Sequence, residues 1–304
     1  MNDLALYIES GKQLIDSFIN DHFIKKGYGK KFPHNKFSLA EAMLYTLTTP
    51  GKRIRPIILM LTAESLGFQD KKRLLPFASS IELIHSYSLI HDDLPSMDND
   101  SLRRGKPTSH IVFGEATAIL AGDALLAEAF AMLSDINYVR GFDPVKIIET
   151  INELSNASGA SGLVEGQFHD VNSFGESLKL EHIEYINEKK TASLISAACA
   201  VGAILSGNDK NIVTEFKKFG LYIGLAFQAV DDVLGVTGNK EILGKTAGID
   251  KINNKPTTAE NIGLENTREL IKKYNKKAMD HLEKTGAKTG MLIKLISYLT
   301  DRIN

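Results

Sequence analysis

Apolar residues in this chain recur mostly at the spacing of an α-helix, and two stripes near its C-terminal end are clear examples. The first stripe consists of Leu270, Ile271, Tyr274, Ala278 and Leu282, and the second of Leu292, Leu295, Ile296, Leu299 and Ile303. Residues three or four positions apart lie on one face of a helix, so each stripe predicts an amphipathic helix. The segment "EKTGAKTG" between the stripes predicts a turn.

Three further segments are apolar on nearly every side, which is typical of helices in the centre of a bundle. They are "EATAILAGDALLAEAFAML" (Glu115–Leu133), "SLISAACAVGAIL" and "FGLYIGLAFQAVDDVLGV". No series of alternating β-branched strands is evident, the chain has only 8 prolines, and no Pro/Ser/Gly-rich linker interrupts the pattern. The pattern therefore predicts an all-α fold, a single large helical bundle in which residues 1–304 form one domain.

The composition is that of an ordinary globular protein, with 43% apolar and 24% charged residues in a chain of 304. The 36 basic and 37 acidic residues leave a net charge of −1. No global field therefore favours nucleic acid or a membrane surface, and we expect no nucleic-acid partner. Any electrostatic function must come from local clusters of charge.

The chain contains one cysteine, Cys199, within the apolar run Ile195–Leu205. A single cysteine excludes an internal disulfide and a multi-cysteine zinc site, and it favours a reducing compartment. The first ten residues carry acids and lack a basic segment before an apolar one, so we expect no signal peptide. The uninterrupted apolar runs are shorter than the roughly 18–20 residues of a membrane span. We therefore expect a cytoplasmic protein without membrane insertion.

The most concentrated polar cluster is "HDDLPSMDND", which follows an apolar segment. It contains four carboxylates, those of Asp92, Asp93, Asp98 and Asp100. Such a cluster is costly unless a cation lies within it, and hard oxygen donors suit Mg²⁺ or Mn²⁺ better than zinc. On an unbroken helix Asp92 and Asp98 would lie about 240° apart, but Pro95 predicts that the chain unwinds and lets Asp98 turn back. A polar helix end followed by a solvated turn would account for the cluster equally well.

A second pair of adjacent acids, Asp231 and Asp232, lies inside the strongly apolar segment "AFQAVDDVLGV". Carboxylates in such a helix are costly unless they are paired or bind a metal. A single buried acid is often salt-bridged. Two adjacent acids that match an earlier pair favour a metal role instead.

Two basic clusters accompany the acids. Lys52, Arg53 and Arg55 lie in "PGKRIRP" at a predicted helix start, where cations and backbone amides together make a good anion site. Arg103 and Arg104 follow the first acid cluster in "LRRGKPT", an order that suits a metal ion together with a polyanion. A basic surface turn would explain the first cluster, and simple balancing of the acids would explain the second.

Further lysines are scattered along the chain. Lys190 and Thr191 occur in "NEKKTASL", and Lys245 and Lys255 occur in the polar stretch "GKTAGIDKINNK", which predicts a loop able to act as a lid. A lysine in a solvated loop usually has no such role. Taken together, two acid clusters and several basic clusters on a helical frame favour a substrate that carries diphosphate groups.

These motifs resemble those of the trans-isoprenyl diphosphate synthases, and most closely the bacterial farnesyl diphosphate synthase group, the geranyltranstransferases. The similarity covers nearly the whole chain in order. The matching segments are "GKRIRP", "ELIHSYSLIHDDLPSMDNDSLRRGKPT", "FGEATAILAGDALL", "GLVEGQ", "EKKTASL", "AFQAVDDVLG" and "GKTAGIDKINNKPT". The resemblance implies an isoprenoid-synthase bundle with a central substrate cavity, a homodimer, and head-to-tail prenyl transfer between isoprenoid diphosphates.

The resemblance also implies roles for individual residues. Asp92 and Asp98 would hold two Mg²⁺ ions, or Mn²⁺, and Asp231 a third. The allylic diphosphate would be bound by Arg103, Lys190, Lys245 and Lys255, and isopentenyl diphosphate by Lys52, Arg55, His85 and Arg104. Thr191 and Gln228 would direct oxygen dipoles at the allylic cation. With Lys190, they form the implied catalytic set.

The product is expected to depend on the residues one helical turn before Asp92, namely Tyr87 and Ser88. An aromatic side chain there resembles the floor of a farnesyl pocket, so the resemblance implies a C15 product. Geranyl or geranylgeranyl diphosphate synthesis is the alternative. Residues of another size at these two positions would give shorter or longer products.

Three positions depart from the family pattern. Gly235 replaces the last acid of the second motif, Asn99 stands where relatives often have an acid, and Pro50 replaces a glycine. Gly235 invites a different interpretation, a non-catalytic regulatory subunit of a prenyl synthase. A metal-dependent phosphohydrolase built on His91 and Asp92 would leave the basic clusters unexplained, and a terpene cyclase would need only one diphosphate site.

Overall fold

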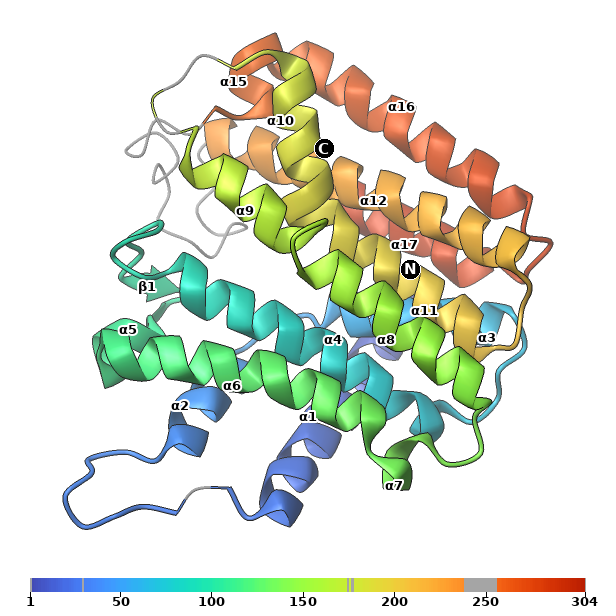
Figure 1. The fold of residues 1–304 in the computed structure, drawn as a ribbon. Helices are drawn as coiled ribbons and strands as arrows, with labels where there is room; N and C mark the ends of the chain where they lie inside the picture. The colour runs from blue at the N-terminus through green and yellow to red at the C-terminus, as the bar shows by residue number, and fades with distance from the viewer. Residues whose placement is uncertain (1, 29, 174, 176–177, 238–255, 304) are drawn as a thin grey trace. The chain divides into compact units, whose positions relative to one another are not determined.

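The computed structural model describes residues 2–28, 30–173, 175, 178–237 and 256–303 (Figure 1). These residues form helices and one short two-stranded sheet, so the predicted all-α fold class is confirmed. By their internal contacts they divide into two compact units. Ala5–Ile57 with Asp70–Gly141 is called the N-terminal unit here, and Ile58–Gln69 with the chain from Phe142 onward and the first four residues is called the C-terminal unit.

The N-terminal unit is built around a long buried helix. Its elements are most of α1 (Asn2–Lys26), α2 (Leu39–Leu47), the start of α3 (Ile54–Ser65), α4 (Lys71–Asp92), β1 (Leu102–Arg103), β2 (Lys106–Pro107), α5 (Ser109–Phe113), α6 (Glu115–Ser134) and α7 (Ile136–Val139). Nearly every residue of α4 from Leu74 to Ile90 is buried, and α4 packs along α6 (Figure 1). This burial fixes the end of α4, where the first acid cluster begins.

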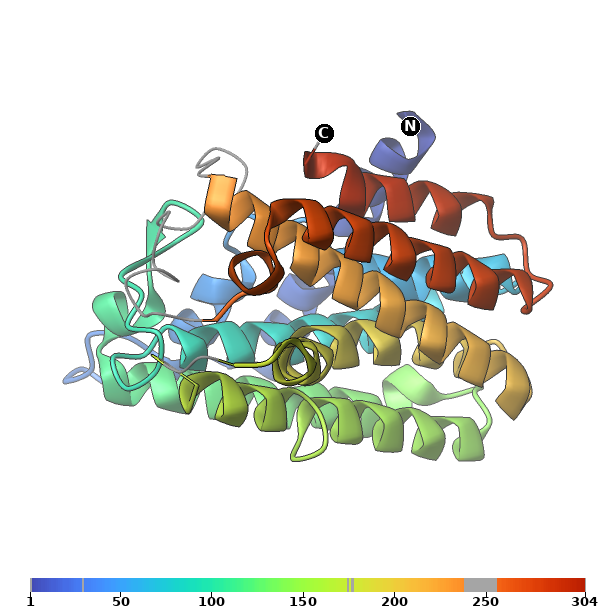
Figure 2. The same cartoon turned by 90° about the horizontal axis from the view of Figure 1, so that it is seen from above.

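The C-terminal unit is formed mainly by long helices. Its elements are the rest of α3, α8 (Pro144–Ser158), α9 (Leu163–Val171), α10 (Leu180–Asn187), the π-helical turn η1 (Glu188–Ala192), α11 (Ser193–Leu205), α12 (Lys210–Thr237), α15 (Thr258–Ile262), α16 (Leu264–Glu283), α17 (Gly290–Thr300) and the 3₁₀ turn η2 (Asp301–Ile303). α12 packs against α11 on one side and α16 on another, as Figure 2 shows in orange and red. Most residues of the two predicted C-terminal stripes are buried in α16 and α17, whereas Leu270 is half-buried and Ile303 lies in η2.

The small sheet was not expected from the sequence. β1 and β2 pair antiparallel through a two-residue turn formed by Arg104 and Gly105. Both turn residues have positive φ, 54° and 74°, which is the backbone that a tight hairpin of this twist needs. Four residues of strand are too few for an alternating pattern, so the sequence offered only the Arg–Gly dipeptide as a signal.

Two helices, α6 and α12, are long and apolar enough to cross a membrane by length and composition alone. Their uninterrupted apolar runs are shorter than a membrane span, because acids such as Asp123 and Asp231 divide them. Within the most apolar windows of these helices, 44% and 61% of residues are buried in the protein. Core helices pass the same test, so the two helices are weak evidence for a membrane span.

Candidate active site

The first acid cluster forms a turn that returns to the end of α4. The helix ends at Asp92, and the backbone amide of Asp98 donates a hydrogen bond to the Asp92 carbonyl oxygen at 2.9 Å. Asn99 adopts a left-handed φ of 54°, a conformation that asparagine tolerates better than most residues. The predicted unwinding beyond Asp93 is confirmed. The turn brings the backbones of Asp92 and Asp98 together, with Asp92 partly exposed and Asp98 buried.

Asp93, the second acid of the pair, points into the protein and binds Arg103. The Arg103 Nε lies 2.7 and 2.9 Å from the two carboxylate oxygens, and Arg103 Nη2 lies 3.8 Å from Asp100 Oδ2. Burial raises the pKa of Asp93 to about 6, although Arg103 opposes that shift. Arg103 therefore binds two acids of the cluster, Asp93 and Asp100, all within the N-terminal unit. Its predicted contact with an allylic diphosphate stays a prediction.

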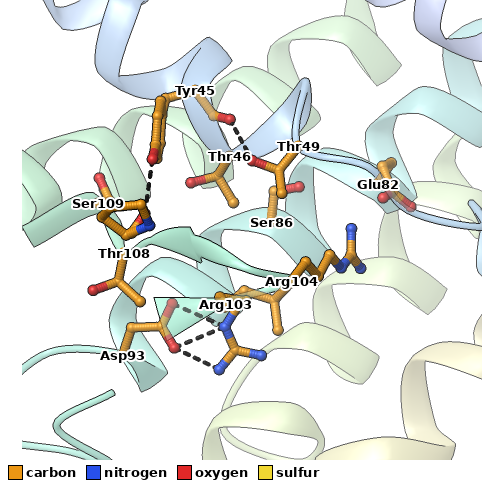
Figure 3. Close-up of a pocket in the computed structure, with 12 residues that line it drawn as sticks. Tyr45, Thr46, Thr49, Glu82, Ser86, Asp93, Arg103, Arg104, Thr108 and Ser109 are labelled. Atoms are coloured by element: carbon orange, nitrogen blue, oxygen red, sulfur yellow. Dashed lines mark hydrogen bonds and ion pairs between the residues drawn. The ribbon is translucent and has the colours of Figure 1, made fainter. Parts of the chain in front are cut away.

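Arg104 lines a polar pocket of the N-terminal unit (Figure 3). The hairpin turn places its guanidinium so that Nη1 donates to the Pro50 carbonyl oxygen at 2.9 Å. Thr49, Glu82 and Ser86 line the same pocket. Arg104 thus lies beside the basic segment "PGKRIRP". The resemblance implies that Arg104 and this segment bind the same ligand, isopentenyl diphosphate.

The basic segment "PGKRIRP" at the start of α3 directs its three cations differently. Lys52 is exposed, Arg53 is buried, and Arg55 Nη1 lies 3.2 Å from His85 Nε2 on α4. Burial and the neighbouring arginines hold the pKa of His85 well below its ordinary value, so the imidazole is neutral at physiological pH. Arg55 and His85, predicted to share a substrate, are therefore in contact.

Tyr87 and Ser88 lie on α4 before the acid cluster. The Tyr87 ring is 5% exposed and meets the His91 ring edge-on, with centroids 5.7 Å apart. His91 Nε2 in turn lies 3.1 Å from the Ile119 carbonyl oxygen of α6. A Cβ at Gly122 would lie 2.2 Å from His91 Nε2, so glycine is needed for this approach. The Ser88 hydroxyl donates to the His85 carbonyl oxygen at 2.8 Å.

In the C-terminal unit, Lys190 lies in the π-helical turn η1. Such turns are rare and frequently occur at functional sites. The Lys190 ammonium donates to Asp170 Oδ2 at 2.7 Å. A Cβ at Gly166 would lie 2.2 Å from the Lys190 backbone nitrogen, so the glycine of "GLVEGQ" lets α9 approach the turn. Sequence reasoning missed Asp170, whose only signal is its place four residues after Gly166.

The second acid pair lies on α12 and its members also differ. Asp232 is buried and accepts hydrogen bonds from Gln228 Nε2 and the Thr258 backbone amide, each at 2.9 Å. Gln228 Oε1 accepts from the Thr191 hydroxyl at 2.8 Å, so the two predicted dipoles are in contact. Burial raises the pKa of Asp232 to about 6.

Asp231 is partly exposed and pairs with Arg302 of the turn η2, at 2.9 Å between Oδ1 and Nη1. Arg302 was not identified from the sequence, because no motif marks it. A Cβ at Gly235 would meet no described atom within 4 Å, so the missing acid of the motif has room there among the described residues. Lys245 and Lys255, the predicted lid lysines, lie outside the described residues.

The described residues contain no cluster of three or more His, Cys, Asp or Glu side chains arranged to hold a metal ion. Mg²⁺ in enzymes is usually bound by one or two carboxylates and completed by water and substrate phosphate. Asp92 and Asp98, joined by one backbone hydrogen bond, have the donor chemistry of such a site. The residues therefore fit a magnesium ion that is shared with a phosphate ligand.

Comparisons with known proteins agree with these features. The family description "Polyprenyl synthetase" matches residues 36–298. The chain is 45% identical over 268 residues to the large subunit 1 of the chloroplastic heterodimeric geranylgeranyl pyrophosphate synthase of Arabidopsis thaliana, covering 87% of this chain and 72% of that protein. It is 43% identical over 262 residues to the farnesyl diphosphate synthase of Geobacillus stearothermophilus, covering 85% and 88%. A solved Helicobacter pylori geranyltransferase, complexed with magnesium and isoprenyl diphosphate, superimposes with a TM-score of 0.83, 31% identity and coverage of 99% and 97%.

Proposed function

Because the chain belongs to the polyprenyl synthetase family and is a short-chain trans-prenyltransferase, we propose that it condenses isopentenyl diphosphate with dimethylallyl and geranyl diphosphate. The proposed products are farnesyl diphosphate and diphosphate. The fold is the all-α fold of the solved trans-prenyltransferases. The single observation that carries the proposal is the turn that returns Asp98 to Asp92 within the family match.

Magnesium is the proposed metal, bound by Asp92, Asp98 and Asp231. Three ions, or Mn²⁺ in their place, are proposed from the family resemblance, and the Helicobacter pylori relative crystallised with magnesium supports the choice. The bound ions would supply positive charge to the departing diphosphate. Carboxylate oxygens without thiols at these positions are the donors that magnesium prefers.

The chain's own residues are proposed to act on the allylic substrate as follows. Lys190 and Arg103, with Lys245 and Lys255, bind the diphosphate and stabilise its charge as the allylic C–O bond breaks. Thr191 and Gln228 direct oxygen dipoles at the allylic cation. The alkene of isopentenyl diphosphate then attacks this cation, a C–C bond forms, and the proton lost from the new chain goes to the released diphosphate. No side-chain base is needed.

Isopentenyl diphosphate is proposed to bind to Lys52, Arg55, His85 and Arg104. The neutral His85 ring adds a hydrogen-bonding group without adding charge, while the two arginines attract the anion. The contacts of Arg55 with His85 and of Arg104 with the Pro50 carbonyl support a shared site. This arrangement favours an enzyme over the regulatory-subunit alternative, which would need no second diphosphate site.

A direct assay tests this function. Purified protein is incubated with Mg²⁺, isopentenyl diphosphate and, separately, dimethylallyl, geranyl or farnesyl diphosphate, and the products are separated by chain length. We expect farnesyl diphosphate from the first two primers. Hydrolysis alone, a cyclised product or no turnover would contradict the proposal.

The product length is proposed to be set by Tyr87, whose buried ring lies one turn before the acid cluster. A geranylgeranyl product is the second candidate, because the Arabidopsis relative is the large subunit of a heterodimeric geranylgeranyl pyrophosphate synthase. Tyr87→Ala should lengthen the product of a farnesyl enzyme. Tyr222→Ala, which removes a tyrosine outside the predicted site, is the control and should leave product length unchanged.

The assembly is proposed to be a homodimer of one polyprenyl synthase domain per chain. Ile119 and Leu120 on α6 are 43% and 58% exposed, and an apolar helix face of this kind is suited to a second copy. We further propose a cytoplasmic protein that is not inserted into a membrane, in keeping with its single buried cysteine. Sedimentation at several concentrations tests the dimer.

A further inference from the structure

Arg53 has an unfavourable backbone conformation that its surroundings must maintain. Its φ is 51°, in the left-handed region that non-glycine residues seldom occupy, and the residue is only 4% exposed. Strained conformations of this kind persist where neighbouring groups hold them, and they cluster at functional sites.

The guanidinium of Arg53 is bound by three elements of the N-terminal unit. Nε donates to Asp16 Oδ1 of α1 at 2.8 Å, and Nη1 donates to Glu82 Oε1 of α4 at 3.2 Å. Nη2 donates to the carbonyl oxygens of Leu47 and Thr49 at the end of α2. Every nitrogen of the fork therefore has a partner, a geometry that only arginine can provide.

The two cations on either side of Arg53, Lys52 and Arg55, lie in different surroundings. Lys52 is exposed, whereas Arg55 contacts His85 on α4. Glu82 and His85 are three residues apart on α4, a rise of about 4.5 Å. Arg53, just before α3, and Arg55, in the first turn of α3, thus attach the start of this helix to α4.

Arg104 is placed by the basic segment "PGKRIRP". A Cβ at Gly51 would lie 2.2 Å from Arg104 Nη1 and 2.7 Å from Arg53 Nη1, so both guanidinium groups pass close over the glycine. Arg53 has the carboxylates of Asp16 and Glu82 as counter-ions. Its positive charge is therefore compensated inside the unit, and it does not compete with Arg104 for an anionic ligand.

We infer that Arg53 is a positioning residue for isopentenyl diphosphate: its buried fork holds this segment so that Lys52, Arg55 and Arg104 present their cations to the diphosphate. The inference rests on the proposed function and extends it to a residue that the family resemblance did not assign. Arg53 itself does not touch the substrate. It fixes the positions of those that do.

The experiment compares two substitutions with a matched control. Arg53→Lys keeps the charge and loses the fork, and Glu82→Gln keeps the shape and weakens one counter-ion. Glu128→Gln is the control, because Glu128 is a buried carboxylate of the same unit that binds His22 at 2.7 Å and Tyr28 at 2.5 Å. The readouts are Tm, the KM for each substrate, and the Kd for isopentenyl diphosphate alone by calorimetry.

We expect Arg53→Lys and Glu82→Gln to raise the KM and Kd for isopentenyl diphosphate about tenfold, because small misplacements of a binding group are costly. The KM for the allylic diphosphate should change less than about twofold, and Glu128→Gln should lower Tm without this selectivity. Parallel changes in both KM values, or no change in Kd, would make Arg53 a scaffold residue only. If Arg53→Lys does not fold, the selective change in KM and Kd for isopentenyl diphosphate is judged on Glu82→Gln alone.

A third variant, Lys52→Ala, distinguishes the positioning role of Arg53 from the proposed isopentenyl diphosphate site. If Lys52→Ala weakens isopentenyl diphosphate binding and the Arg53 and Glu82 variants do not, the inference fails and the proposed site stands. If Lys52→Ala also leaves the Kd unchanged, the proposed site fails and the inference fails with it.

Discussion

The two adjacent acid pairs of this chain share one arrangement and differ in their partners. In each pair the first acid, Asp92 or Asp231, is partly exposed, and the second, Asp93 or Asp232, is buried. Burial raises the pKa of both second acids to about 6. An Asp–Asp motif in a buried helix thus provides one carboxylate for solvent or ligand and one for the protein interior.

The difference lies in what binds each carboxylate. Asp93 is bound by the charged guanidinium of Arg103, whereas Asp232 is bound by the neutral groups of Gln228 and Thr258. Conversely, Asp231, the partly exposed acid of the second pair, forms an ion pair with Arg302. In the first pair an arginine, Arg103, therefore binds the buried acid. In the second pair an arginine, Arg302, binds the partly exposed acid.

The largest effect is expected from Asp92→Asn. If Asp92 binds the metal that neutralises the departing diphosphate, kcat should fall by about 10³-fold or more, since such electrostatic groups supply several kcal/mol. Steady-state kinetics at saturating Mg²⁺ provide the measurement. A loss below about tenfold would remove Asp92 from the proposed metal site.

Asp93→Asn should chiefly affect folding. It leaves the buried Arg103 charge without its main partner, and removing one member of a buried pair costs about 3–5 kcal/mol. Urea denaturation of the wild type and the variant measures the change. A loss below about 1 kcal/mol would show that Arg103 finds another partner or water.

Asp232→Asn should change the pH dependence of stability. The folded-state pKa of about 6 lies above the ordinary value of 3.8, so the folded protein binds this proton more tightly than the unfolded chain. The contribution of Asp232 to the free energy of unfolding therefore increases as pH falls from about 6 to about 4, by roughly 2 kcal/mol.

The Asp232→Asn variant should lack this contribution, and urea denaturation at several pH values measures it. Asp3→Asn is a suitable control, because Asp3 is an exposed acid whose pKa is lowered and whose contribution has the opposite sign. Identical pH profiles for wild type and Asp232→Asn would contradict the raised pKa.

The smallest effect is expected from Arg302→Gln. A partly exposed ion pair contributes about 0–1 kcal/mol, so freeing Asp231 from Arg302 should tighten Mn²⁺ binding by about two- to fivefold. Electron paramagnetic resonance of free Mn²⁺ gives the affinity. Weaker binding in the variant would mean that Arg302 supports the site rather than competing with the ion.

Much of the fold and part of the site could be predicted from the sequence. Helical periodicity located α16 and α17, because a one-sided apolar face is a local property of the chain. Pro95 predicted the turn between Asp93 and Asp98 for an equally local reason. The resemblance assigned Thr191 and Gln228 to one role and Arg55 and His85 to another, and the members of each pair lie in contact, while the roles themselves stay predictions.

The partners that lie far apart in sequence could not be predicted. Asp170 meets Lys190 across 20 residues, and Arg302 meets Asp231 across 71. Such pairings depend on how whole helices pack, which no local pattern encodes. The sequence grouped Arg53 with Lys52 and Arg55 as cations of a candidate anion site and did not indicate that Arg53 is buried, since its charge looks the same in the sequence whether it faces water or Glu82.

The central claim is that the exposed acid of each pair binds metal and the buried acid does not. The most direct test is the number of Mn²⁺ ions retained in the presence of dimethylallyl diphosphate by the wild type, Asp92→Asn and Asp232→Asn. The account predicts wild-type binding for Asp232→Asn and the loss of bound Mn²⁺ for Asp92→Asn. Full retention by Asp92→Asn, or equal loss in both variants, would contradict it.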